Sequence, residues 1–125
     1  SLVDNKPFPT LFWLVDPEIN YALDKLEARG VIASLQQRID ESPKLQHSMA
    51  ADHARHISLR NHLMTPEEEA ALKRLGYYEA LQQRGIGGIE KSSRIRCLHT
   101  WYAAHMVHPN TVGQMVDEQL AKAAN

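Results

Sequence analysis

The amino-acid sequence predicts a mainly α-helical single domain over residues 1–125, with about five to seven helices and one or two short extended segments or strands. Three observations support this fold class. Pairs of an acidic or hydroxyl residue and a proline, which start helices, recur along the chain. Apolar residues follow these pairs at helical spacing, and glycines end several of the runs. A chain of 125 residues buries about two-thirds of its unfolded surface, so the core needs no disulfide or metal.

The charge balance and the cysteine count exclude several classes of protein. With 14 Lys+Arg against 15 Asp+Glu, the formal net charge is -1, which argues against a general nucleic-acid binder. The single cysteine cannot form an internal disulfide. No apolar run approaches the roughly 20 residues of a membrane-spanning helix, and residues 1–16 show no secretory signal. We therefore expect a cytoplasmic domain that binds neither nucleic acid nor membrane, and the sequence leaves its oligomeric state open.

The beginning of the chain predicts an extended segment. Pro7 and Pro9 bias the residues before them away from the helical conformation. Residues 10–15 then form a short apolar run rich in aromatic and branched side chains, which has the length and composition of a strand. Because the run has few polar positions, we expect it to lie in the core.

Two helices are expected next. Asp16-Pro17-Glu18 combines an acidic N-cap, a proline at the first helical position and an acid near the positive end of the helix. Helical spacing continues to Gly30, which predicts the end of this helix. A second, shorter helix is predicted over residues 31–39.

Two strong start signals predict the helices of the middle of the chain. Ser42-Pro43 begins a helix that extends to residue 63. Its expected inner stripe consists of Leu45, Met49, His53, His56, Arg60 and Leu63. Thr65-Pro66-Glu67-Glu68 is a capping box, and it opens a helix that Gly76 ends.

The rest of the chain predicts shorter elements and two final helices. Residues 77–84 are expected to form one or two helical turns before a glycine-rich loop at 85–88. Pro109 separates the last two helices, which are predicted over residues 98–107 and 111–123.

Two histidine pairs suggest a metal site. His53 and His56 are three residues apart on one predicted helix, and His105 and His108 are three apart on another. Residues at this spacing share a helical face, so two imidazoles can reach one Zn²⁺, Ni²⁺ or iron ion. Asp52 can add a carboxylate. The competing interpretation is that these histidines make interhelical hydrogen bonds or face solvent.

The segment Arg96-Cys97-Leu98-His99 suggests a catalytic thiol. Cys97 and His99 lie on the same side only if the chain is extended where it enters the helix. A thiol at a helix N-terminus near Arg94 and Arg96 fits a nucleophile, with His99 or His105 as its base. The competing interpretation is an inert buried thiol, which is a common state of free cysteine.

The segment 84–96 suggests an anion site. It combines glycines, two hydroxyl groups and four cations, and it leads into a predicted helix start. Free backbone N–H groups and cations are typical of phosphate or anion sites. Neither the P-loop pattern G-x-x-x-x-G-K-[ST] nor a strict G-x-G-x-x-G is present. An ordinary charged surface loop is the competing interpretation.

Six short motifs are spread over nearly the whole chain. They are Phe8-Pro9-Thr10-Leu11-Phe12-Trp13-Leu14, Leu26-Glu27-x-x-Gly30, His53 with Arg60, Gly87-Gly88-Ile89, Arg96-Cys97-Leu98-His99 with His105, and Asn110-Thr111-Val112-Gly113. Together they resemble a bacterial domain-of-unknown-function family, numbered 501. The chain departs from the family pattern at His56, where the family tends to have Tyr, and at Thr111, where it has Pro.

The resemblance implies no activity, but it favours some candidate residues over others. His56 and His108 do not match the family motifs. The resemblance therefore favours a metal set of His53, Cys97, His99 and His105, which would hold a divalent ion such as Zn²⁺. Beside it we predict a set that binds a ligand or anion, formed by Arg60, Gly87, Gly88, Arg94 and Arg96.

Three functions remain open at this point. The first is a module that binds a small ligand, anion or metal ion at a Cys/His pocket beside the glycine-rich basic loop. The second is a thiol-dependent enzyme with Cys97 as nucleophile. The third is a non-enzymatic protein-interaction module that uses an exposed aromatic or helical face.

Overall fold

The computed structural model describes residues 2–3, 6–7, 16–89 and 91–124. The elements of these residues are the antiparallel strands β1 (Leu2–Val3) and β2 (Lys6–Pro7), the helices α1 (Pro17–Ala28), α2 (Val31–Asp40), α3 (Pro43–Leu63), α4 (Pro66–Leu75) and α5 (Tyr78–Gln82), the 3-10 turn η1 (Ile86–Gly88), and the helices α6 (Leu98–Val107) and α7 (Thr111–Ala124). The mainly α-helical fold class is confirmed. The predicted strand at residues 10–15 lies outside the described residues.

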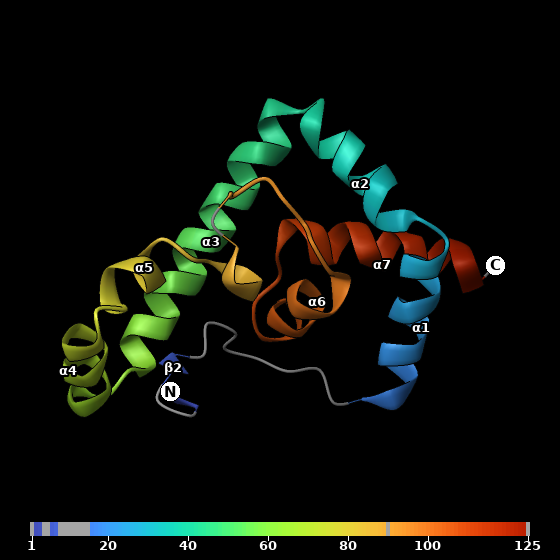
Figure 1. Cartoon of the computed structure of the whole chain (residues 1–125). Helices are drawn as coiled ribbons and strands as arrows, with labels where there is room; N and C mark the ends of the chain where they lie inside the picture. The colour runs from blue at the N-terminus through green and yellow to red at the C-terminus, as the bar shows by residue number, and fades with distance from the viewer. Residues whose placement is uncertain (1, 4–5, 8–15, 90, 125) are drawn as a thin grey trace.

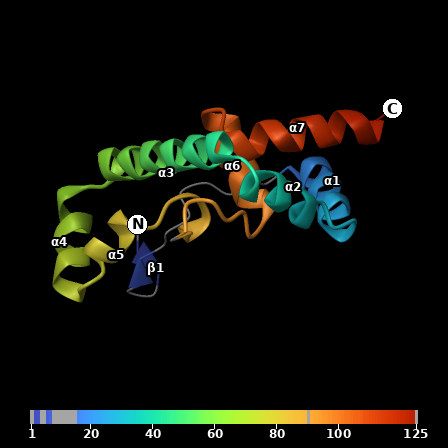
Figure 2. The ribbon, with the colours of Figure 1, turned by 90° about the horizontal axis from the view of Figure 1, so that it is seen from above.

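The helices are arranged around α6 and α7. Helices α1, α2 and α3 follow one another around this pair, and α6 and α7 pack against each other (Figure 1). Helix α6 also contacts α1 and η1, and α3 contacts η1 and α7. Helices α4 and α5 pack together at the end of α3 that lies away from α1 and α2 (Figure 2). The chain therefore returns past α3 between α5 and α6.

The predicted helix boundaries are confirmed at the N-terminal and the C-terminal ends of the helices. The Asp16 carboxylate accepts two backbone N–H groups of α1, at 2.9 and 3.2 Å. The Ser42 hydroxyl accepts one of α3 at 3.1 Å, and Thr65 forms the expected capping box. Gly30 and Gly76 follow α1 and α4 in the left-handed conformation, both with φ 79°. These ends are local in origin, because a cap needs only residues within one turn.

The apolar faces of the helices meet in one core around Trp101. This side chain is fully buried, and its indole N–H donates to the Ile95 carbonyl oxygen at 2.9 Å. Other fully buried side chains around it are Leu23, Leu35, Ile39, Met49, Ile95, Leu98, Val112 and Val116. Within the part of the chain that the structure describes, no helix has both the length and the apolarity to cross a bilayer.

Helix α3 buries mostly polar side chains. Its buried residues are Met49, Asp52, His53, His56 and Arg60. The predicted stripe is wrong at its end, because Leu63 is 55% exposed. It lies in the last turn of the helix, beyond the core that surrounds α6 and α7. Two of these polar side chains, His53 and Arg60, bond the backbone of the segment between α5 and α6.

Candidate functional site

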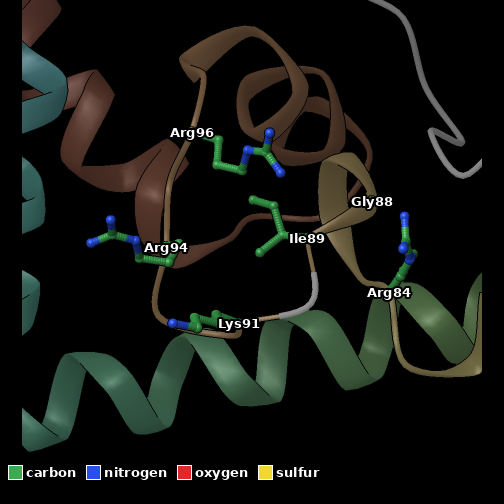
Figure 3. Close-up of a pocket in the computed structure, with 6 residues that line it drawn as sticks. All are labelled: Arg84, Gly88, Ile89, Lys91, Arg94 and Arg96. Atoms are coloured by element: carbon green, nitrogen blue, oxygen red, sulfur yellow. The ribbon is translucent and has the colours of Figure 1, made fainter. Parts of the chain in front are cut away.

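A pocket of about 450 Å³ lies on the segment between α5 and α6 (Figure 3). Its described lining residues are Arg84, Gly88, Ile89, Lys91, Arg94 and Arg96. Four of these six residues are cationic, and none is acidic. The structure therefore brings Gly88, Arg94 and Arg96 of the predicted anion set to one pocket, together with two cations that the set omitted.

The four cations stand around the buried side chain of Ile89. Figure 3 shows Arg96 above Ile89 and Lys91 below it, with Arg94 and Arg84 on opposite sides. Lys91, Arg94 and Arg96 are exposed. Within the part of the chain that is described, the side chains of these three residues make no hydrogen bond or ion pair. Their charges are therefore available to a ligand that enters from solvent.

The backbone is strained at Arg96. Its φ of 67° is the one positive value of a residue other than glycine in the described segments. This left-handed conformation costs about 1–2 kcal/mol for a residue with a Cβ. The preceding residue, Ile95, is fully buried and held on both sides, since its N–H donates to Gln36 at 3.0 Å and its carbonyl accepts from Trp101. Strain of this kind is frequent at binding sites.

His53 holds the two ends of the loop that lines the pocket. Its Nδ1 accepts the N–H of Ile86 at 3.0 Å, so Nε2 carries the proton and donates to the Ser92 carbonyl oxygen at 3.0 Å. The ring also stands edge-on to Trp101, with centroids 4.9 Å apart. Burial lowers the pKa of His53. Both ring nitrogens are thus engaged by the backbone, and neither is directed to a metal.

Arg60 supports the loop from below rather than lining the pocket. Its Nη2 donates to the carbonyl oxygens of Leu81 and, at 2.6 Å, Arg84. The side chain is buried, and burial lowers the pKa of its guanidinium. Arg60, a member of the predicted anion set, therefore holds the backbone of Arg84 in place and does not line the pocket.

The glycines of the loop allow close packing. The N–H of Gly88 donates to the Gly85 carbonyl oxygen at 3.0 Å, so this group, which the sequence analysis expected to be free for an anion, is occupied. Gly87 does not line the pocket, and it has φ 68°. A Cβ on Gly87 would lie 2.8 Å from Oγ1 of Thr100 on α6. Both glycines therefore serve the shape of the loop.

His99 faces two carboxylates of α1. Its Nε2 lies 2.9 Å from Asp24 Oδ1, and its Nδ1 lies 3.4 Å from Glu27 Oε2. The same Glu27 oxygen accepts the N–H of Leu98 at 2.8 Å and so caps α6. Asp24 and Glu27 are three residues apart and share one face of α1. The sequence analysis missed this partner pair, because nothing in the order of residues joins α1 to α6.

His105 joins α6 to α7. Its Nδ1 accepts the N–H of Asn110 at 3.0 Å, and Nε2 donates to Asp117 at 2.8 Å. The other Asp117 oxygen accepts from the Tyr102 hydroxyl at 2.7 Å. Burial and this carboxylate raise the pKa of Tyr102 to about 12. A Cβ on Gly113 would lie 2.1 Å from the His105 ring, so glycine is needed for this contact.

Cys97 is the N-cap residue of α6, in the extended conformation that the sequence analysis required for a Cys97–His99 pair. Its Sγ contacts the Thr100 hydroxyl at 3.1 Å. His99 is turned toward α1 instead, and no hydrogen bond within the described residues joins a histidine ring to this thiol. Among the described residues, the hydrogen-bond partner of the thiol is thus a hydroxyl and not an imidazole.

The predicted metal set of His53, Cys97, His99 and His105 is not brought together. Within the residues that the structure describes, the one group of three or more metal-ligating side chains with ligand atoms inside 4.8 Å of one another is Asp24, Glu27 and His99. The other three members of the set each have a separate structural partner. Sequence spacing could not reveal the partners of His53 and His105, because these come from other segments of the fold, whereas Thr100 lies only three residues after Cys97.

His56 and His108, the two remaining members of the predicted His-x-x-His pairs, border a small cavity of about 30 Å³, together with Asp52 and other residues. A cavity of this volume has room for about one water molecule. Burial lowers the pKa of His56 to about 4, and the neighbouring charge of Arg60 acts in the same direction. His108 is exposed. One member of each predicted His-x-x-His pair, His56 and His108, therefore lines this cavity.

Comparison with models of known protein families shows the family to which the chain belongs. A family model described as "Protein of unknown function (DUF501)" matches residues 1–118. The chain belongs to this family. The match confirms the family that the six motifs indicated and covers both the basic loop and the histidines of α3 and α6. No curated protein and no solved structure matches the chain.

Membership of the DUF501 family does not change the roles that the geometry gives to these residues. His53, Arg60, His105 and the glycines hold segments together, whereas Arg96 and the neighbouring Arg94 face solvent at the pocket. The two added cations, Arg84 and Lys91, were visible in the sequence as part of one charged segment. Their place in the same pocket depends on how the loop folds over α3.

Proposed function

We propose that this DUF501 chain binds a small anionic ligand, carrying phosphate-like oxyanion groups, in the basic pocket between α5 and α6. In this proposal residues 1–125 act as one cytoplasmic domain. The observation that carries it is the local charge: four of the six described lining residues are cations, and the segment 84–96 has four cations against one acid, Glu90, in a chain whose net charge is -1. Such a pocket has a positive potential that attracts anions.

The chemistry of the cations favours oxyanions. Three of the four are arginines, whose planar guanidinium groups can bind two oxygens of one phosphate or carboxylate at once. A volume of about 450 Å³ lies within the range of small-molecule sites and exceeds what one inorganic anion fills. The exposed side chains would lose rotamer freedom on binding, at about 0.5–1.5 kcal/mol each, so several contacts are needed for useful affinity.

Removing charge at the pocket tests this function. We expect Arg94→Gln/Arg96→Gln to weaken binding of pyrophosphate about 100-fold by isothermal titration calorimetry, since each lost charge-assisted hydrogen bond contributes about 1.5 kcal/mol. Both side chains are exposed, so the variant should fold as the parent does.

The matched control is Arg38→Gln/Arg74→Gln, which removes the same charge from exposed positions on α2 and α4. This variant should keep the parent affinity within about twofold, because it alters only the long-range field. Equal weakening in both double variants would show that net charge alone attracts the anion. That result, or no binding by the parent chain, would refute the proposed site.

A further inference from the structure

The segment that supplies three of the six described lining residues of the pocket is held between two hydrogen bonds of one imidazole. His53 accepts from the N–H of Ile86 and donates to the carbonyl oxygen of Ser92, each at 3.0 Å. Gly88, Ile89 and Lys91 lie between these two points in the chain. One ring on α3 therefore fixes both the start and the end of the segment.

This arrangement requires the neutral ring. Protonated histidine has an N–H on both nitrogens, so Nδ1 could no longer accept from Ile86. The amide of Ile86 is buried, and a buried donor without a partner is unfavourable. Protonation of His53 and the present loop conformation therefore exclude each other.

The surroundings of the ring contain few other charges. From α3, Asp52 and His56 act on it electrostatically. From the loop, its contacts are the backbone groups of Ile86 and Ser92, and from α6 the uncharged Trp101. Burial is the largest influence on the pKa of His53 and lowers it, although Asp52 and Ser92 act in the opposite direction.

We propose, on the basis of the proposed anion site, that His53 is a positioning residue whose neutral ring holds the basic loop in its binding shape and whose protonation releases it. Anion affinity should then fall as the pH is lowered. General electrostatics gives the opposite sign, because protonation of the other histidines makes the protein more positive and attracts anions. The direction of the pH dependence thus separates the two effects.

Sulfate is the probe, because its charge stays constant between about pH 7.5 and pH 5.5 while histidines titrate. We expect the dissociation constant of the parent chain to rise about fivefold over this range, the equivalent of one lost hydrogen bond. In His53→Asn, whose amide oxygen can replace Nδ1 as acceptor without titrating, the constant should stay level or fall. His62→Gln, at an exposed position of the same helix, should follow the parent chain.

The outcomes are distinguishable. No sulfate binding at about pH 7.5 would overturn the proposed function itself. Binding that weakens equally in the parent chain and in His53→Asn would overturn only the role of His53. If that variant does not fold, amide NMR of the parent chain replaces it: the Ile86 N–H signal should shift with the same midpoint as the loss of sulfate affinity, and different midpoints would refute the coupling.

Discussion

Replacement of Gly85 by alanine is expected to lower the free energy of unfolding by about 3 kcal/mol, the upper end of what overpacking in a core costs. The added Cβ would lie 2.0 Å from Nδ1 of His53, and both residues are buried. The ring cannot move away without breaking its bonds to Ile86 and Ser92. Urea unfolding followed by circular dichroism measures the loss.

Gly76→Ala is the control for this substitution. Gly76 has φ 79°, and nothing lies within 4 Å of an added Cβ, so only backbone strain of about 1–2 kcal/mol is expected. A second test uses the partner side chain. In the double variant Gly85→Ala/His53→Ala the clash is absent, so its destabilisation should be well below the sum of the two single effects. Simple additivity would show that the contact with His53 is not the cause.

Acidification is the second condition with a large expected effect on stability. Burial, with smaller effects of Arg60 and His53, lowers the pKa of His56 to about 4. In the unfolded chain the ring takes up a proton near its ordinary value of about 6.5, whereas the folded chain does so only near the lower value. Between these two values the unfolded state binds more protons than the folded state, so the free energy of unfolding decreases as the pH is lowered. This free energy has its full value above about pH 6.5 and should be about 2 kcal/mol smaller at pH 5.

Chemical denaturation at about pH 7.5 and pH 5 measures this slope. His56→Gln removes the titrating ring, so its slope should be shallower by about the contribution of His56, and His53 should retain a smaller effect of the same sign. The control is His62→Gln, since His62 is exposed on the same helix and should leave the slope unchanged. A parent chain whose stability does not change over this range would contradict the burial of a neutral His56.

The helices could be predicted from the sequence with few errors, because their signals act within one turn. Asp16, Ser42 and Thr65 each accept an N–H two or three residues ahead, and Gly30 and Gly76 supply the left-handed conformation at the helix ends. Because these signals are local, they do not show how far the core extends along a helix. On α3 the apolar pattern could not show that Leu63, in the last turn, lies beyond the core.

Only the positive charge of the candidate site could be predicted, because the cations lie close together in the sequence. Four cations within one short segment predicted an anion site, and the structure brings all four to a single pocket. The roles of the histidines could not be predicted in this way. His53 and His105 use the same pattern, with Nδ1 accepting a backbone N–H and Nε2 donating to an oxygen, and each ring packs against a glycine.

The sequence by itself therefore determined the helical class, the helix boundaries and the concentration of positive charge between α5 and α6. These properties depend on composition and on neighbours along the chain. Only the tertiary structure decided that His99 meets Asp24 and Glu27, that His105 meets Asp117, and that the predicted metal ligands stay apart. The physical reason is that an imidazole has just two nitrogens, and in a folded core the nearest backbone or carboxylate group engages them, whichever element it comes from.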